Sequence, residues 1–466
     1  MAVYGKIGLD YMLYKKLFFF FWLIIISLIL SVCALDKNID IQNEFSVSER
    51  KWTFIIYMAA DNDLEYAAIA NFKELEAVNY GNTPISILVL LDRSPYYDMT
   101  NGNWSGTRLY EIKTDIYNTA LINSTRLNCP ELGLTKDTDV NLNTADPLVL
   151  SKLIDFSKRV YPAENYALII WGHGTGWRSN ADSFNSKSPL KAIAFDDTHG
   201  QYMSLPAFGR AIENKGLSVI GFDTCYGAVL EVAYQIRNNA EILIGSEGAI
   251  LSSGWNYTSL FNDFINKPEL SIINLSASII KQFSERYSSL SNATISQIRL
   301  SQIENLFIKF NNFTGNIANS IVTQTSRNIV LNEILNNVES HYFTSFPSDL
   351  YIDVFDFCQK INAIRANITA NDNEKNAINN AAVELDNALS AAIPSSWAQN
   401  GTTKKIGVHV IPLQGINVPA SSHELAYIKN SMAIDKSAFV TNSLHWVPNA
   451  VPQPNSLLDK LFYFIF

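Results

Sequence analysis

Residues 217–230 read Leu-Ser-Val-Ile-Gly-Phe-Asp-Thr-Cys-Tyr-Gly-Ala-Val-Leu, an apolar run that stops at Asp223-Thr224-Cys225. Small residues follow and then a helical pattern, so we predict that Cys225 lies at a turn from a strand into a helix. Amides at the start of a helix stabilise a thiolate and can donate to an oxyanion. Taken by itself, however, the stretch fits a buried structural cysteine at least as well as a nucleophile.

A second apolar run, residues 166–171, leads into Gly172-His173-Gly174. Glycines on both sides leave the imidazole uncovered and let the backbone approach a ligand. His173 precedes Cys225 by 52 residues, close to the separation of about 50 residues in caspase-type sites. Because the carboxyl ends of strands in an open α/β sheet face one crevice, we predict that His173 and Cys225 meet there as base and nucleophile.

Apolar runs alternate with helical patterns from residue 51 to about residue 250. Strands are expected near residues 52–58, 85–91, 166–171, 192–195, 217–222 and 240–246, and helices near 64–78, 146–160 and 204–214. Residues 94–143, which include Cys129, are expected to form a hairpin excursion. The alternation predicts an α/β fold with a mostly parallel sheet and helices on both faces.

The pattern changes at about residue 267. Long helical stretches follow at 271–287, 301–335 and 374–392, with strands expected at 294–299 and 406–411. We therefore expect a catalytic domain over residues 51–266 and a helix-rich region over residues 267–448 packed on it. Residues 449–466 are Pro-rich and then apolar, and we interpret them as a docking tail because they are too short to span a bilayer.

The first 34 residues have the order of an export signal. Lys15-Lys16 precede a run of 14 residues, 17–30, that is apolar except for Ser27, and Ser-Val-Cys-Ala follows at 31–34. The run is short for a membrane span and typical of a signal-peptide core. Three alternatives stay open: cleavage after Ala34, lipid modification of Cys33, and an uncleaved anchor. We expect an exported protein, secreted, periplasmic or lipid-anchored to a membrane, with residues 35–50 as a spacer.

Composition restricts the partners. The formal net charge is −9 and the mature region has no basic run, so a nucleic-acid partner is disfavoured. The four cysteines, at 33, 129, 225 and 358, are too scattered for a zinc site or a disulfide framework. The histidines also lack metal-ligand spacing, so we predict no metal site from the residues alone. We expect a monomer that acts on proteins or peptides.

Four motifs in order resemble the clostripain family of cysteine peptidases, which belongs with the caspases, legumain and gingipains. They are Tyr-Met-Ala-Ala-Asp-Asn-Asp-Leu-Glu at 57–65, Trp-Gly-His-Gly-Thr-Gly-Trp at 171–177, Asp-Thr-Cys-Tyr-Gly at 223–227 and Gly-Trp-Asn-Tyr at 254–257. The likeness covers about residues 51–447. It implies a caspase-like α/β fold, a dyad of His173 and Cys225, and oxyanion donors at the amides of Gly174 and Cys225.

The resemblance also implies where substrate binds. Asp223, two residues before the cysteine, stands where family members line a pocket for Arg or Lys at P1. Glu247, at the end of the next expected strand, is a second substrate-binding candidate. The second pocket acid that family members often carry just before the Gly-Trp pair is replaced here by Ser252-Ser253.

Maturation and metal dependence are further expectations from the resemblance. Family members cut themselves after the histidine, and here the polar 180–191 loop offers Lys187 and Lys191, which would give a two-chain product. The chemistry requires no cofactor, but the family prototype depends on calcium, so Ca²⁺ stays a candidate.

These observations favour peptide-bond hydrolysis through an acyl-enzyme on Cys225. No third residue that orients His173 can be assigned, and the acids that end the strands at 61–63 and 92 fit turn chemistry or helix capping as well as catalysis. Two alternatives remain: a catalytically inactive caspase-like binding protein, and a transpeptidase that uses the same dyad.

Overall fold

The computed structural model describes residues 50–176, 193–267, 269–289, 292–342, 350–401, 404–412 and 462–464. Several expectations lie outside these residues: the export signal with Cys33, the spacer to residue 49, the loop with Lys187 and Lys191, and most of the tail. Within the described residues, no helix combines the length and apolar character needed to cross a membrane.

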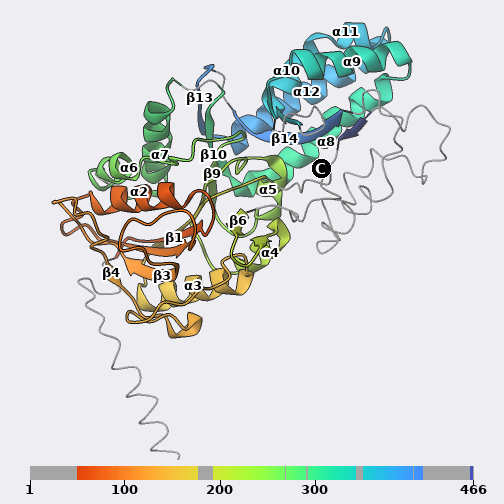
Figure 1. Ribbon diagram of the computed structural model, residues 1–466. Helices are drawn as coiled ribbons and strands as arrows, with labels where there is room; N and C mark the ends of the chain where they lie inside the picture. Colours follow the sequence, from red (N-terminus) through yellow and green to blue (C-terminus); the bar gives the residue numbers. More distant parts are fainter. Residues whose placement is uncertain are drawn as a thin grey trace, which may run out of the picture. The chain divides into compact units, whose positions relative to one another are not determined.

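The centre of the molecule is a nine-stranded sheet with the order β13-β10-β9-β8-β5-β1-β2-β3-β4 (Figure 1). Its five middle strands are parallel: β9 (Ile242–Gly245), β8 (Val219–Asp223), β5 (Asn165–Trp171), β1 (Trp52–Ala60) and β2 (Ile85–Arg93). Antiparallel strands close both edges: β3 (Gly106–Glu111) and β4 (Thr125–Arg126) on one side, β10 (Thr294–Arg299) and β13 (Ser395–Ala398) on the other.

Both faces of the sheet are covered. Every residue of β1 and of β2 is buried, as expected of parallel strands between two helical layers. Alternate β1 residues enter different cores: Phe54 and Met58 pack with aromatic residues of one layer, and Ile55 and Tyr57 pack with the other. The predicted fold class is confirmed.

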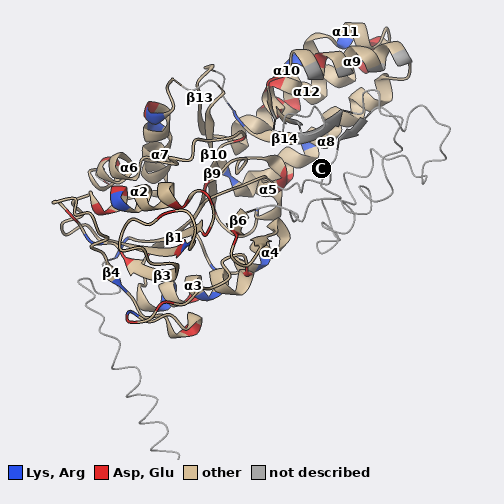
Figure 2. Ribbon diagram, viewed as in Figure 1, with Lys and Arg blue, Asp and Glu red and all other residues tan. Residues whose placement is uncertain are grey.

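The two layers are built from short amphipathic helices. One layer contains α2 (Glu65–Glu76), α6 (Tyr257–Ile265) and α7 (Ile272–Arg286), and the other contains α3 (Pro147–Val160), α4 (Leu205–Ala211) and α5 (Leu230–Gln235). α3 begins where predicted, because Asp146 accepts a hydrogen bond from the Leu148 amide and Pro147 occupies the first helical position. Acidic and basic residues are interspersed over these elements (Figure 2).

The remaining elements are shorter or lie towards the C-terminus. They are β6 (Ile193–Asp196), β7 (Gln201–Met203), the 3-10 turns η2 (Pro130–Leu132) and η3 (Leu300–Gln302), the helices α8 (Ile303–Ser320), α9 (Gln324–Asn336), α10 (Val354–Ala363), α11 (Arg365–Ile368) and α12 (Asp372–Ala392), and a four-stranded antiparallel sheet of β11 (Ser340–Tyr342), β12 (Leu350–Asp353), β14 (Gly407–Pro412) and β15 (Phe462–Phe464). The helix predicted over 301–335 is two helices, because Thr323 caps a new one through a capping box with Ser326.

The expected boundary between residues 51–266 and 267–448 does not divide the structure. β10 and β13 lie beyond residue 266, yet they extend the central sheet next to β9. The described residues also belong to one compact unit. The boundary was misplaced because four- to six-residue strands among long helices carry little periodic signal.

Candidate active site

His173 and Cys225 leave the same edge of the sheet on neighbouring strands. β5 and β8 are parallel and adjacent, and Trp171 pairs with Asp223 at their carboxyl ends. His173 and Cys225 each follow their strand's last residue by two positions. The Gly172 amide donates to the Asp223 carbonyl at 3.4 Å. The structure thus brings together the two loops that the sequence predicted to meet.

Glycines let the histidine loop lie directly against the cysteine turn. A Cβ atom on Gly174 would lie 2.5 Å from the Cys225 carbonyl oxygen and 2.6 Å from Thr224 Oγ1. Gly172 has φ +136°, and a Cβ there would lie 2.9 Å from the Ala59 carbonyl oxygen. A larger residue at position 174 would therefore push the two loops apart, and one at position 172 would clash with the backbone of β1.

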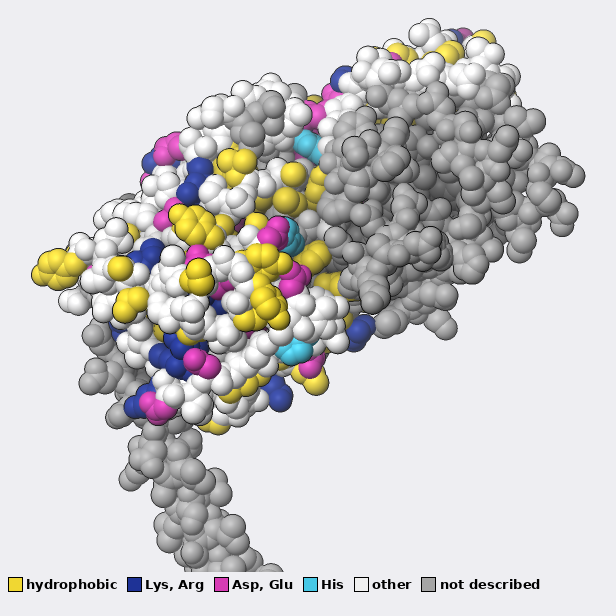
Figure 3. All heavy atoms as spheres, viewed as in Figure 1, with side chains coloured by type: hydrophobic (Ala, Val, Ile, Leu, Met, Phe, Trp, Pro, Cys, Tyr) yellow, Lys and Arg dark blue, Asp and Glu magenta, His cyan; other side chains and the backbone are white. Residues whose placement is uncertain are grey.

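His173 is held by an acid that the sequence did not assign. Its Nε2 atom lies 2.6 Å from Asp63 Oδ1, and its side chain is 37% exposed. The ring also packs edge-on against Phe195, with 5.4 Å between centroids. On the face in Figure 3, histidine and acidic side chains lie next to one another among hydrophobic ones. Asp63 thus contacts the histidine for which the sequence offered no orienting residue; its position just beyond the end of a strand was its only signal.

Cys225 is partly buried and contacts the loop after β9. The Ile250 amide donates to its Sγ atom at 3.4 Å, and the thiol lies 3.8 Å from the Ile250 carbonyl oxygen. Burial raises the pKa of the Cys225 thiol, and the charge of Asp223 raises it further. The thiol form is therefore favoured, and attack on a substrate needs a base.

The expectation that helix amides stabilise the thiolate is corrected. α5 begins at Leu230, five residues after Cys225. Between them, Tyr226 has φ 56°, and its amide donates to the Gly248 carbonyl at 3.0 Å. Hydrogen bonds to the loop after β9 fix the cysteine turn, and the amide that donates to the thiol is that of Ile250 rather than one of the helix.

Cys225 differs from the other described cysteines. Cys129 and Cys358 are both fully buried. Burial raises the pKa of each of these two thiols to about 12. Among the described residues, Cys225 alone combines a partly exposed thiol with a histidine on the neighbouring loop.

Part of the C-terminal region borders the site. The Tyr351 hydroxyl, on β12, donates to the Thr175 carbonyl at 3.0 Å. Its ring stacks on Tyr226, with 4.9 Å between centroids. The loops that carry His173 and Cys225 are therefore both supported from beyond residue 266.

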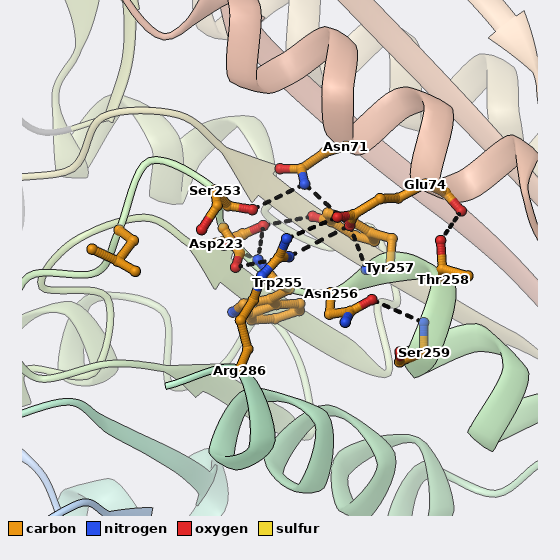
Figure 4. A network of polar contacts seen from close by, with 12 residues as sticks. Asn71, Glu74, Asp223, Ser253, Trp255, Asn256, Tyr257, Thr258, Ser259 and Arg286 are labelled. Carbon is orange, nitrogen blue, oxygen red and sulfur yellow. Dashed lines mark hydrogen bonds and ion pairs between the residues drawn. The ribbon is translucent and has the colours of Figure 1, made fainter. Parts of the chain in front are cut away.

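Asp223 ends β8 two residues before Cys225, and its carboxylate is bound by the chain itself (Figure 4). It is 2% exposed, and it accepts hydrogen bonds from the Trp255 amide at 3.0 Å and from the Tyr257 hydroxyl at 2.8 Å. Burial raises the pKa of Asp223 to about 7. The Gly-Trp-Asn-Tyr motif needs its glycine, because Gly254 has φ +58° and a Cβ there would lie 2.7 Å from the Asp223 carboxylate.

A cation of the chain itself lies near Asp223. Arg286, from α7, pairs with Glu74 of α2 at 2.8 Å and donates to the Gly254 carbonyl at 3.4 Å. Its charge lowers the pKa of Asp223, against the larger effect of burial. Figure 4 shows these groups converging around the 253–257 loop.

Glu247 lies in a separate ionic cluster. It is fully buried, 3.4 Å from His341 Nε2 and 3.8 Å from Lys405 Nζ. Lys405 also lies 2.5 Å from Glu339 and 3.8 Å from Asp353. Glu247 therefore does not fit the substrate-binding role expected of it, because its carboxylate is closed to solvent and faces a lysine and a histidine of the same chain.

A mostly parallel sheet with a histidine and a cysteine on neighbouring strand ends defines the class of caspase-like α/β proteins. The chain belongs to the clostripain family, whose model matches residues 56–425. The family resemblance is thus confirmed.

Individual relatives agree with this assignment. Clostripain of Hathewaya histolytica is 30% identical over 250 residues, a match that covers 49% of this chain and 45% of that protein. The chain therefore matches less than half of that relative's length.

Two solved structures are similar in fold. An inactive zymogen of a C11 protease from Parabacteroides distasonis has a TM-score of 0.57 and 18% identity, covering 82% of this chain and 96% of that one. A secreted C11 cysteine protease from Bacteroides thetaiotaomicron, in complex with an irreversible peptide inhibitor, has a TM-score of 0.53 and 16% identity, covering 82% and 98%. At these identities the likeness concerns the fold.

Proposed function

We propose that this chain is a cysteine endopeptidase that hydrolyses peptide bonds through an acyl-enzyme on Cys225. The observation that carries the proposal is the pairing of Trp171 with Asp223, which places His173 and Cys225 on touching loops. Membership of the clostripain family supports the same chemistry.

In this mechanism His173 removes the thiol proton as Cys225 Sγ attacks the substrate carbonyl. Because Nε2 faces Asp63, Nδ1 is the atom that exchanges protons with the thiol. The amides of Gly174 and Cys225 hold the oxyanion, and one good donor contributes about 3 kcal/mol to the transition state. His173 then protonates the leaving amine, and a water molecule that it deprotonates cleaves the thioester and releases the acid product.

Arg or Lys is the proposed P1 residue, through the carboxylate of Asp223. Its position two residues before Cys225 supports the preference, whereas its burial and the nearby charge of Arg286 weaken it. A charge-assisted contact contributes about 1.5–3 kcal/mol, so the preference over Ala should be about tenfold to a hundredfold at most.

Export and self-processing belong to the same proposal. The order of Lys15-Lys16, an apolar run and small residues supports export, and one structural relative is described as secreted. Mass spectrometry of the mature N-terminus separates the routes: Leu35 means ordinary cleavage, lipidated Cys33 a lipoprotein, and Met1 or Met12 an anchor. Cutting at Lys187 or Lys191 should require Cys225, so Cys225→Ala should stay a single chain on a denaturing gel.

The experiment that tests the activity is incubation of the chain with a peptide library, with Cys225→Ala as the control. Hydrolysed products that are absent from the control support a peptidase. Products joined to an added amine identify a transpeptidase, and intact peptides identify a binding protein. Full turnover by the control would contradict the proposal.

A further inference from the structure

Three buried carboxylates meet at the ends of β1, β2 and β6. Asp61 follows β1, and Asp92 and Asp196 lie at the ends of β2 and β6. Asp61 and Asp92 are 0% exposed and Asp196 is 1% exposed. One oxygen atom from each lies within 4.8 Å of the other two. Three like charges so close together in a buried position repel one another unless something between them compensates.

Asp61 is the member that points to a missing ligand. Among the described residues, neither of its carboxylate oxygens has a hydrogen-bond partner, although both are buried. Its neighbours are held firmly: Asp92 accepts from the hydroxyls of Thr107 at 2.7 Å and Thr144 at 2.9 Å, and Asp196 accepts from the Thr144 amide at 3.0 Å. A buried carboxylate without a donor is costly, and no described residue supplies a donor or a cation to Asp61.

In the cluster around Glu247, the charge of the buried carboxylates is balanced by a cation of the chain itself. There the fully buried Lys405 lies within 4.0 Å of three carboxylates and supplies the cation itself. In the cluster of Asp61, the ion pair found among the described residues is that of Asp196 with His199, at 2.9 Å. His199 is 32% exposed, so it approaches from the solvent side of Asp196 and leaves Asp61 unpaired.

We propose that Asp61, Asp92 and Asp196 bind a divalent cation, with Ca²⁺ as the preferred ion. Carboxylate oxygens are the ligands that Ca²⁺ and Mg²⁺ take, whereas softer metals prefer sulfur or imidazole. Oxygens on opposite sides of a Ca²⁺ ion lie about 4.8 Å apart, because each Ca–O distance is about 2.4 Å. The observed spacing of the three oxygens, within 4.8 Å, is compatible with that span.

The site also has a route to the catalytic loops. Asp61 and Asp63 belong to one turn between β1 and α2, and Asp63 contacts His173 at 2.6 Å. An ion on Asp61 would tie this turn to the ends of β2 and β6 and so fix the position of Asp63. This link rests on the proposed function, but ion binding itself does not.

Ion binding can be measured without activity. The full chain is prepared as Cys225→Ala, so that self-cleavage cannot alter it, and is freed of metal with a chelator. Terbium(III) is then titrated and its luminescence followed, and Ca²⁺ or Mg²⁺ is added to displace it. We expect one saturable terbium site per chain, displaced by Ca²⁺ at lower concentration than by Mg²⁺. Asp61→Asn should weaken terbium binding at least about tenfold.

The matched control is Glu247→Gln, which removes a buried carboxylate from the cluster that has its own lysine. It should bind terbium like the parent protein. Melting in chelator checks the fold: Asp61→Asn should melt no lower than the parent, because it loses an unpaired buried charge. No saturable binding by the parent, or equal binding by Asp61→Asn, would overturn the proposal and leave a proton or surface acids as the explanation. A chain that binds Ca²⁺ but cleaves no peptide would reject only the proposed function.

Discussion

Two groups of polar side chains lie near the carboxyl ends of the central parallel strands, and they differ in exposure. His173 and Cys225 follow β5 and β8, and the histidine is 37% exposed. The carboxylates of Asp61 and Asp92 lie at the ends of the adjacent strands β1 and β2, and that of Asp196 comes from β6 of a separate two-stranded sheet; all three are at most 1% exposed. His173, Cys225, Asp61 and Asp92 share this edge because the apolar parallel strands stop there. Their exposure separates groups that can reach a substrate from groups that can only bind something small.

The largest effect should come from the exposed group. Cys225→Ala and His173→Ala should each lower kcat/KM by about four orders of magnitude or more. Their melting temperatures should stay close to that of the parent, because both side chains are only partly buried. Initial rates on a peptide substrate and thermal melting measure the two quantities. A residual rate above about a tenth of the parent in either variant would place the chemistry elsewhere.

The three buried carboxylates should show the opposite pattern: a substitution there should change the free energy of unfolding in Ca²⁺ more than it changes kcat/KM. At a free Ca²⁺ concentration one hundred times the Kd, binding should add about 2.7 kcal/mol to the free energy of unfolding of the parent protein. Asp61→Asn should gain little from Ca²⁺, whereas Glu247→Gln should gain as much as the parent. Melting in Ca²⁺ and in chelator measures this, and an equal gain in all three proteins would remove the distinction between the two groups.

Asp63 connects the two groups and should have a smaller effect. Asp63→Asn should lower kcat about tenfold, as expected when a positioning hydrogen bond to a charged partner is weakened. KM and melting temperature should change little, because the Asp63 side chain is 68% exposed. Asp63→Glu should restore part of the rate, and Asp137→Asn, an exposed acid elsewhere, is the control. Equal losses in Asp63→Asn and Asp137→Asn would deny Asp63 this role.

The smallest effect concerns Asp223 and pH. Its pKa is raised to about 7, so the carboxylate ionises as pH rises through 7, and the preference for Arg over Ala at P1 should rise several-fold over the same range. Asp223→Asn should show a flat preference, measured as the ratio of kcat/KM values from about pH 6 to 8. A parent ratio that does not vary with pH would separate Asp223 from P1 recognition.

The same shift has a consequence for stability. The pKa in the folded chain, about 7, lies above the ordinary value of 3.8. The stability contributed by this group is therefore complete below about pH 4 and is lost as pH rises through 7. Relative to Asp223→Asn, the parent should lose stability over that interval.

Much of the candidate active site could be predicted from the sequence, because strand ends and glycines are local signals. The apolar runs that end at Trp171 and Asp223 suffice to predict that His173 and Cys225 lie at one edge of the sheet, and β5 and β8 do pair there. The partnership of Asp63 with His173 could not be predicted, because it joins residues 110 positions apart. The burial of Glu247 likewise depends on Lys405, which lies far along the chain.

The start of the helix after Cys225 could not be predicted from local sequence patterns either. Its helical pattern is real, but α5 starts only at Leu230, because Tyr226 and Ala228 first donate to the loop after β9. Short strands such as β10 and β13 join the sheet through long-range pairing, which periodicity within a helix-rich stretch does not reveal.

The most direct test of the dyad is covalent labelling by a peptide that carries a thiol-reactive electrophile, followed by mass spectrometry of the digested protein. Cys129 and Cys358 are buried, with pKa values near 12, so they should stay unmodified in the folded chain. Among Cys129, Cys225 and Cys358, we predict an adduct on Cys225 alone, and we predict that it is lost in His173→Ala. Labelling of Cys225 at the parent rate without His173, or an adduct only on another cysteine, would contradict the dyad.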